Sequence, residues 1–476
     1  MEITSQVGMT HRGPLVKKQR NLGEVVEYFD AHWTVPVDPT LNRMKMLDKA
    51  FDFPSKQLPA IFFAGTNGKT VTAHFTAKIL AHEGLNVGTF TSPHLLMYKE
   101  RFAVDLKGMP SRIFTELGNE VIAAAEELSL QAHTSELLAL MALIYFKRNN
   151  VDVAIFEVTH AQSMTDPVTI VDAKISTITR VTAKEAIISE AELLQCARGI
   201  ATLITPGMHV ISGDQNKATL SLLQAVTREL GGVWAMPVRK LAHLKYPFEQ
   251  LHGRCAALAE RVAQLFIEYH LDHALINEAT SLLVRTTGKR GRPTLSIKRA
   301  QELNPRKTID QFWKEVECGV AGKFQVLDKE KPTVLLDTAS NLDAVKNVLL
   351  GIRLLHYQRP LKGLTIIIGA AKNTLHSDEF LKLVRYFFKK TPGQIFVCPP
   401  GEPIAGVNEE VSWDVEQVAN ELKAMKVKHV RSCISFEEAF ELARKTVDER
   451  NGLVVVMGSQ SIVGSYFKAK GVKKLQ

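Results

Sequence analysis

One short loop of the sequence carries groups that could hold a phosphate. Residues 65–70, Gly-Thr-Asn-Gly-Lys-Thr, follow the apolar run AIFFA and precede a stretch whose apolar residues recur at helical spacing. Glycines let backbone N–H groups turn towards phosphate oxygens, and the first turn of a helix adds partial positive charge. Lys69 is placed to reach the β- and γ-oxygens, and the Thr70 hydroxyl to reach Mg²⁺. This phosphate loop (P-loop) predicts a nucleotide site made of Gly65, Thr66, Asn67, Gly68, Lys69 and Thr70.

The phosphate loop departs from the complete motif at one position. Phe63 stands where the first glycine of G-x-x-x-x-G-K-[ST] is expected. A plain glycine turn before a helix is therefore the alternative interpretation. Because a strand, a loop, a lysine, a hydroxyl and a helix occur here together, the pattern favours a nucleotide-binding loop.

The segments around this loop alternate between apolar strand patterns and helical patterns. Residues 86–94 and 151–158 have strand patterns, residues 135–150 have a helical one, and the alternation restarts at residues 333–337. Such alternation predicts an α/β protein with parallel sheets that are covered by helices. We expect three parts, namely an ATP-binding domain at 1–284, a basic linker or inserted arm at 285–322 and a C-terminal ligase domain at 323–476.

Length and composition exclude several classes of protein. A chain of 476 residues is too long for one compact core, and 45% apolar with 23% charged residues is ordinary for a folded soluble protein. No apolar run is long enough to span a membrane, and the first twenty residues lack the apolar run of a signal peptide. The five cysteines are widely spread, which favours reduced thiols in the cytoplasm. We therefore expect a cytoplasmic protein without a membrane partner.

The net charge of +9 is concentrated in one segment. Residues 285–307 carry eight Lys or Arg and one Glu. A solvated basic linker is the simplest interpretation, and an arm that collects an anionic substrate is the alternative. Because the segment has no aromatic residues on which bases could stack, we do not expect a nucleic-acid partner.

Further motifs lie before and after the phosphate loop, in a fixed order along the chain. After AGTNGKT comes TSPHLLMYKERF; LNRMKML lies upstream, and VDVAIFEV, GKFQVLD, VLLDTASN and MGSQSIVGS lie downstream. In this order, over nearly the whole chain, they resemble the folylpolyglutamate synthase/dihydrofolate synthase family of the Mur ligase superfamily. The resemblance implies a Mur-ligase-like central domain that carries the phosphate loop and a smaller Rossmann-like C-terminal domain.

The resemblance also implies a reaction and its participants. ATP would phosphorylate a substrate carboxylate, and the amine of an amino acid would attack the acyl phosphate. The implied cofactors are ATP and Mg²⁺, the implied substrates are glutamate and a folate or pteroate, and a monomer is the implied state. The implied residues are Lys69, Lys184 and Asp337 for catalysis; Lys323, Asp337 and Asn341, with the phosphate loop, for the nucleotide; Thr70, Ser92 and Glu157 for the metal; and Arg43, His94 and Tyr98 for the substrate. For Tyr98, packing in the core is an equally good interpretation.

The chain departs from the family pattern at several of these positions. Lys184 falls near the family's third metal ligand, a histidine, and a cation there would repel Mg²⁺ although it could neutralise phosphate. Ala197 falls where relatives carry a carbamoylated lysine, Ala259 lies near an adenine-contacting asparagine, and Ser340 replaces a histidine. Lys184, Arg198 and His160 are the residues that could compensate for these losses.

Three functions remain open on this evidence. An ATP-dependent ligase of the folate type is favoured because its phosphate loop has every group it needs. A catalytically impaired relative that binds a nucleotide or a partner is the first alternative. A Mur-type ligase for another acid is the second, because the loop after Glu157 has lost its glycines and reads THAQSMTDPV.

Overall fold

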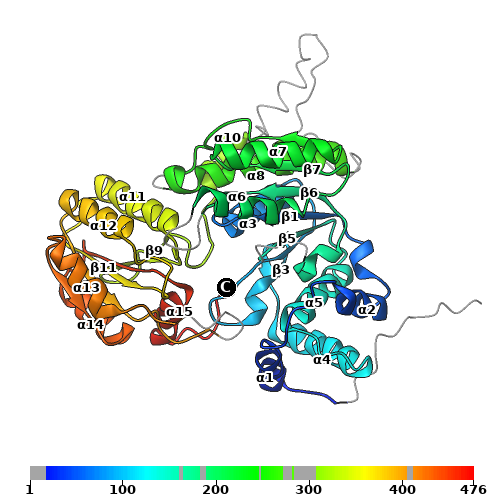
Figure 1. Cartoon of the computed structure of the whole chain (residues 1–476), viewed down its shortest axis with the longest axis horizontal. Helices are drawn as coiled ribbons and strands as arrows, with labels where there is room; N and C mark the ends of the chain where they lie inside the picture. Colours follow the sequence, from blue (N-terminus) through cyan, green and yellow to red (C-terminus); the bar gives the residue numbers. More distant parts are fainter. Residues whose placement is uncertain are drawn as a thin grey trace, which may run out of the picture.

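The computed structural model describes residues 18–159, 165–182, 189–245, 248–271, 281–283, 307–404 and 411–475. Two β-sheets lie side by side in this part of the chain, and helices cover both (Figure 1). The first sheet and its helices use residues up to the green part of the colour bar, and the second uses the yellow-to-red residues. The predicted α/β fold is confirmed.

The first sheet has eight strands in the order β4-β3-β2-β5-β1-β6-β7-β8. Their bounds are β1 Ala60–Ala64, β2 Val87–Phe90, β3 Phe102–Val104, β4 Lys107–Gly108, β5 Val153–Glu157, β6 Ala173–Ile178, β7 His209–Ser212 and β8 Val233–Ala235. Strands β2, β5, β1, β6, β7 and β8 are parallel to one another, as predicted. Strands β3 and β4 are antiparallel, a feature that was not predicted. Antiparallel strands need only a short connection, so no intervening helix announces them in the sequence.

Strand β1 lies in the middle of this sheet and is buried on both faces. Ala60, Phe62 and Ala64 belong to one core, together with helices α1 Leu22–His32, α2 Asn42–Ala50, α4 Ser111–Glu127, α5 Thr134–Arg148, α6 Glu190–Ala201 and α7 Lys217–Glu229. Ile61 and Phe63 belong to the other, together with α3 Lys69–His82 and α8 Phe248–His270. A strand covered on both faces is apolar throughout, which explains the run AIFFA.

The second sheet has six strands in the order β13-β12-β11-β14-β10-β9. Their bounds are β9 Gln325–Leu327, β10 Thr333–Asp337, β11 Leu364–Gly369, β12 Gln394–Cys398, β13 Val430–Ser432 and β14 Leu453–Met457. Only β9 is antiparallel to its neighbour. One face packs against α11 Leu342–Gln358, α12 Asp378–Lys390 and α13 Val415–Ala424, and the other against α14 Phe436–Lys445 and α15 Gln460–Ala469.

The predicted basic arm lies mostly outside the described residues. Of its described part, Ile309–Glu315 form helix α10, and Phe312 and Trp313 are buried in the core that contains α3 and α8. Residues 309–315 therefore pack with the first sheet. The limits 1–284, 285–322 and 323–476 remain a proposal.

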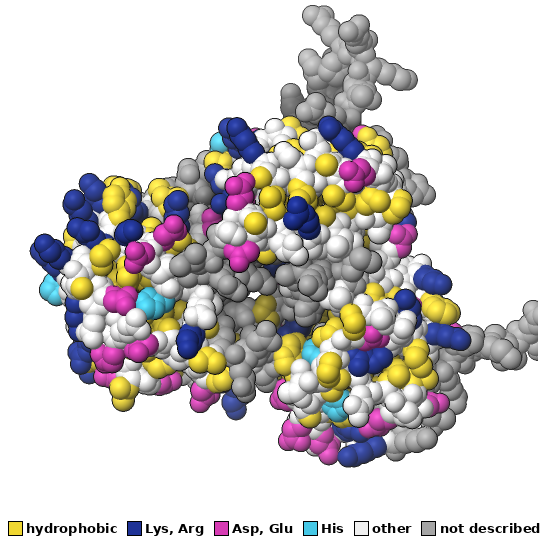
Figure 2. Space-filling model, viewed as in Figure 1, with side chains coloured by type: hydrophobic (Ala, Val, Ile, Leu, Met, Phe, Trp, Pro, Cys, Tyr) yellow, Lys and Arg dark blue, Asp and Glu magenta, His cyan; other side chains and the backbone are white. Residues whose placement is uncertain are grey.

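The surface of the described chain is mixed in charge on the face that Figure 2 shows. Lys and Arg side chains lie among Asp and Glu side chains over both sheets and their helices. Over the described ranges, no helix combines the length and apolar composition needed to cross a bilayer.

The close packing of β2 against α5 provides a test of the first sheet. A Cβ atom at Gly88 would lie 2.7 Å from the buried ring of Phe146. We expect Gly88→Ala to lower the free energy of unfolding by about 1–3 kcal/mol, because the core has no room for a methyl group. Urea unfolding followed by circular dichroism measures this change.

Gly108→Ala is the matched control for this prediction. Gly108 also lies in a strand of the first sheet, but its Cβ would meet nothing within 4 Å among the described residues. We expect a change within about 0.5 kcal/mol. Equal stability of the two variants would contradict the packing described for β2.

Candidate functional site

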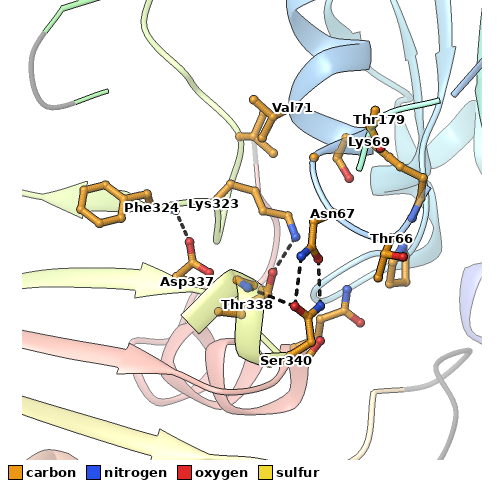
Figure 3. A pocket seen from close by; sticks show the side chains of 18 of the residues that line it. Thr66, Asn67, Lys69, Val71, Thr179, Lys323, Phe324, Asp337, Thr338 and Ser340 are labelled. Atoms are coloured by element: carbon orange, nitrogen blue, oxygen red, sulfur yellow. Dashed lines mark hydrogen bonds between the residues drawn. The ribbon is translucent and has the colours of Figure 1, made fainter. Parts of the chain in front are cut away.

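A cavity of about 1770 Å³ lies between the two sheets. Its walls include the phosphate loop, the ends of β2, β5 and β6, and the segment that follows β10. In α/β sheets, ligands bind at the carboxyl ends of parallel strands, where this cavity lies. It is therefore the candidate functional site (Figure 3).

The phosphate loop joins the end of β1 to the start of α3. Gly65 and Gly68 have φ of +126° and +87°, a left-handed backbone that favours glycine. A Cβ at Gly65 would also lie 2.4 Å from Thr179 Oγ1. Lys69 Nζ donates to the Gly65 carbonyl at 2.9 Å, so the lysine folds back over the loop. The loop thus has the conformation that its sequence predicts.

Glu157, at the end of β5, lies at the centre of the candidate metal site. One of its oxygens accepts hydrogen bonds from Thr70 Oγ1 at 2.9 Å and from the Ser92 N–H at 3.4 Å. Its other oxygen lies 3.8 Å from Lys69 Nζ. Burial raises the pKa of Glu157, and the nearby Lys69 opposes this shift. The three predicted metal ligands, Thr70, Ser92 and Glu157, are therefore brought together.

This donor set fits a hard cation that brings further ligands with it. It contains one carboxylate and two hydroxyls, and no group of three or more His, Cys, Asp or Glu side chains in the described residues forms a metal cage. Mg²⁺ is commonly held by one or two carboxylates, with phosphate and water oxygens completing its shell. Thr70, Ser92 and Glu157 would hold such an ion beside a nucleotide.

Arg101 is a buried residue of the site to which the sequence interpretation gave no role. Its Nη1 donates to Ser92 Oγ at 3.0 Å and its Nε to His94 Nδ1 at 3.0 Å. Its guanidinium carbon lies 5.6 and 5.8 Å from the ring centroids of Trp33 and Tyr98. Arg101 therefore orients both Ser92 and His94. Its place in the motif TSPHLLMYKERF was the available signal.

The second domain contributes the predicted nucleotide-binding residues that lie far from the phosphate loop in the sequence. Lys323 Nζ donates to Thr338 Oγ1 at 2.6 Å, and Asp337 accepts the Phe324 N–H at 2.7 Å. Burial raises the pKa of Asp337 to about 6, and Lys323 opposes this shift. Figure 3 shows Lys323 extending towards the phosphate loop, whereas the Phe324 ring points away from it.

The side chains of Asn67 and Asn341 connect the two walls directly. Each donates its amide to the oxygen of the other, at 3.0 and 2.8 Å, although they are 274 positions apart. Asn341 is also the N-cap of α11 and accepts the Ala344 N–H at 3.0 Å. The structure therefore brings together two predicted nucleotide-binding residues that the sequence separates widely.

The predicted substrate residues do not all reach the large cavity. His94 lines it, but Tyr98 and Arg43 are not among its described lining residues. Tyr98 is 2% exposed, and its hydroxyl donates to Asp30 at 2.7 Å. Arg43 donates to the buried Glu136 at 3.0 Å. Tyr98 instead lines, with His94, a smaller cavity of about 110 Å³. The substrate roles of Arg43 and Tyr98 therefore remain predictions.

Of the three residues that could compensate for the lost family residues, only Arg198 belongs to the described part of the chain. Lys184 and His160 lie outside the described residues. Arg198 is exposed on α6 and is not among the described lining residues, so it cannot replace a lost cavity group. Ala259 is buried, whereas Cys255 and Leu258 of the same helix line the cavity.

Two relatives show how much of the chain is shared with characterised proteins. The chain is 25% identical over 324 residues to the dihydrofolate synthase/folylpolyglutamate synthase of Bacillus subtilis, which covers 66% of this chain and 71% of that protein. It is 26% identical over 238 residues to the folylpolyglutamate synthase of Lacticaseibacillus casei, which covers 49% and 55%. The match thus spans less than two thirds of the second relative. No model of a known protein family matches the chain.

Solved structures share the fold over almost the whole chain. The Mycobacterium tuberculosis folylpolyglutamate synthase complexed with ADP has a TM-score of 0.73 and 19% identity, and covers 94% of this chain and 98% of that one. A bifunctional folylpolyglutamate synthase/dihydrofolate synthase with Mn, AMPPNP and L-glutamate bound has a TM-score of 0.68 and 20% identity, and covers 97% and 100%. The predicted resemblance to these synthases and the two-sheet fold are confirmed, at low sequence identity.

The raised pKa of Asp337 predicts how this residue affects stability. The ordinary pKa is 3.8, so between about pH 4 and 6 the folded protein binds the proton more tightly than the unfolded chain. This group therefore lowers the free energy of unfolding as the pH rises through that range. Asp337→Asn removes this pH-dependent loss of stability, because asparagine does not titrate. Between pH 4 and 6, we expect the free energy of unfolding of the variant to rise by up to about 3 kcal/mol relative to that of wild type. Above pH 6 we expect this difference to stay constant.

Thermal unfolding of both proteins between pH 4 and 7.5 measures this difference. Asp378→Asn, at a carboxylate 88% exposed on α12, is the control and should keep a constant difference from wild type. A constant difference for Asp337→Asn as well would contradict the buried environment of Asp337.

Proposed function

We propose that this chain, a divergent relative of the folylpolyglutamate and dihydrofolate synthases, is an ATP-dependent ligase that joins L-glutamate to the carboxylate of a folate or pteroate through an acyl phosphate. The observation that carries the proposal is the meeting of Lys69, Thr70 and Glu157 with Lys323 and its neighbours around one cavity. The bifunctional synthase structure with AMPPNP and L-glutamate supports the same choice of ligands.

The residues of this chain have distinct tasks in such a reaction. The phosphate loop would hold the triphosphate at the positive end of α3, and Lys69 would contact the transferred phosphoryl group. Lys323 would approach from the second sheet and stabilise the charge that develops on the acyl phosphate and the tetrahedral intermediate. Asp337 and Asn341 would hold the nucleotide on that side.

We propose Mg²⁺ as the metal of the site. When bound, it would neutralise charge on the phosphate oxygens and the developing anion. Thr70, Ser92 and Glu157 would be its protein ligands. Arg101 would keep the Ser92 hydroxyl turned towards the site through their hydrogen bond at 3.0 Å.

We further propose that an aromatic part of the cavity wall receives the ring of the acid substrate. Trp33 and His133 line the cavity, and their rings lie 5.0 Å apart. Aromatic walls bind flat rings by stacking and by burying apolar area. His94, held by Arg101, would contribute a polar contact beside them.

A catalytically impaired relative is the second candidate, and specific residues favour it. Ala197 occupies the place of the carbamoylated lysine, and Ser340 replaces the histidine between Asp337 and Asn341. Neither side chain can carry a charge, so neither can replace the anionic carbamate or the imidazole. Loss of one electrostatic group typically lowers a rate by about 10²–10³-fold, so two such losses would weaken catalysis severely.

We propose that the protein is located in the cytoplasm and that it is a monomer. All five cysteines are free, although Cys318, Cys398 and Cys433 are buried. Free thiols are typical of reducing compartments. ATP and folates, the proposed substrates, would be met there.

The first test is ATP hydrolysis by the full chain with dihydropteroate or folate, glutamate and Mg²⁺. We expect hydrolysis to depend on the added acid, and Lys69→Ala to lower the rate by about 10²–10³-fold because a charge-stabilising group is lost. Lys107→Ala, at a side chain 84% exposed, is the control and should keep the wild-type rate.

Each other outcome of this test selects a different function. ATP binding without acid-dependent hydrolysis would support the impaired relative. Hydrolysis with a different carboxylic acid would support a ligase for that acid. No ATP binding at millimolar concentration would overturn the nucleotide site itself.

A second test concerns the metal. We expect Glu157→Gln to weaken ATP binding by about tenfold or more in the presence of Mg²⁺ and far less in EDTA, because the lost carboxylate would hold the ion. Calorimetry measures both affinities. Mg²⁺ titrated without nucleotide should bind weakly to both proteins, and equal losses with and without Mg²⁺ would contradict a metal role for Glu157.

A further inference from the structure

Arg180, which follows β6, contacts the phosphate loop and the second sheet at the same time. Its carbonyl accepts the Thr66 N–H at 2.6 Å, and residues 67 and 180 form an isolated antiparallel bridge. Its guanidinium donates from Nε and Nη2 to Asp343, at 3.1 and 3.0 Å. Asp343 lies in the first turn of α11. One residue thus links the backbone of the loop to a helix of the other domain.

The contacts around this ion pair strengthen the link. Asn67 Nδ2 donates to Asp343 Oδ2 at 3.0 Å, in addition to its paired amide bonds with Asn341. The buried Asp214 lies 4.0 Å from Arg180 Nη1 and holds the guanidinium from the first domain. Arg180 and Asp343 are 34% and 17% exposed, so solvent screens this pair less than a surface pair.

The position of the pair gives it more than a stabilising role. The predicted nucleotide ligands are divided between the loop and the segment after β10. A nucleotide can therefore contact all of them only when the two walls are close together. Arg180 and Asp343 fix that closeness at the loop itself. The bidentate geometry also fixes the orientation of α11, since a guanidinium fork accepts a carboxylate in only a few arrangements.

We propose that Arg180 and Asp343 are positioning residues that clamp the second domain onto the phosphate loop and thereby set nucleotide affinity. The inference rests on the proposed function, because it assumes that the loop binds a nucleotide. If the nucleotide binds the clamped arrangement, the apparent affinity falls in proportion to the fraction of molecules that are clamped. Turnover at saturating nucleotide, in contrast, stays nearly constant.

The test uses the full chain with Arg180→Gln, Asp343→Asn and the double variant. Asp343→Asn retains size, Arg180→Gln shortens the side chain and removes its charge, and both leave the Arg180 carbonyl in place, so the backbone of the loop keeps its partner. We expect each single variant to raise the Kd for ADP and the KM for ATP about tenfold, the equivalent of one charge-assisted contact. We expect kcat to change less than about twofold. The double variant should be no weaker than either single one.

Two further variants separate the clamp from a general structural effect. Arg180→Lys keeps the charge without the fork and should recover part of the affinity. Asp328→Asn breaks the Arg359–Asp328 pair within the second domain and should leave ADP affinity at the wild-type value. If Arg180→Gln does not fold, Arg180→Lys and Asp343→Asn complete the cycle.

Small-angle X-ray scattering without nucleotide tests the clamp independently of the proposed function. We expect a larger radius of gyration for each single variant than for wild type, with no further increase in the double variant. An unchanged radius, additive losses of affinity, or a matching fall in kcat would overturn the clamp. A wild-type protein that binds no nucleotide but expands on Asp343→Asn would overturn the proposed function and keep the clamp.

Discussion

The central strand β1 is the constraint on which the rest of the site depends. Its side chains alternate between two separate cores, so a shift by one residue would move each of them into the wrong core. The end of the strand is therefore fixed, and with it the start of the phosphate loop. Thr179 and Arg180, which follow the neighbouring strand β6, then confine the loop from the side, because a Cβ atom at Gly65 would collide with Thr179 and the Arg180 carbonyl accepts the Thr66 N–H.

The same constraint explains how residues from distant parts of the chain form one site. Parallel strands end at the same edge of a sheet, so Glu157 at the end of β5 must lie beside a loop that begins at the end of β1. In the second sheet, the segment after β10 leads into α11, whose N-terminal Asn341 meets Asn67. The cavity therefore combines both sheets, because one wall has the phosphate loop and the other has Lys323 and Asp337.

The sequence predicts the parts of this site that have a local signature. The strand, the glycines and the helix start of the phosphate loop are adjacent in the chain, and the alternation of apolar runs indicates both sheets. Contacts across the cavity have no such signature. The pair Arg180–Asp343 joins residues 163 positions apart, and nothing in the neighbouring sequence distinguishes Arg180 from a surface arginine. For the same reason the sequence could not show that the Tyr98 hydroxyl donates to Asp30, 68 positions away.

The charges in the cavity explain why a metal should accompany the nucleotide. Three acidic side chains that line the cavity have a basic neighbour, since Lys69 lies 3.8 Å from Glu157, Arg180 contacts Asp343, and Lys323 counteracts the raised pKa of Asp337. A triphosphate that recruits Lys69 would leave Glu157 buried beside further negative charge, an arrangement that is strongly unfavourable. A divalent cation held by Glu157 would remove this conflict, because it would replace the lysine as the partner of the carboxylate. Under the proposed function, the carboxylate would therefore make metal and nucleotide binding cooperative, and Thr70 and Ser92 are already at hydrogen-bonding distance from it.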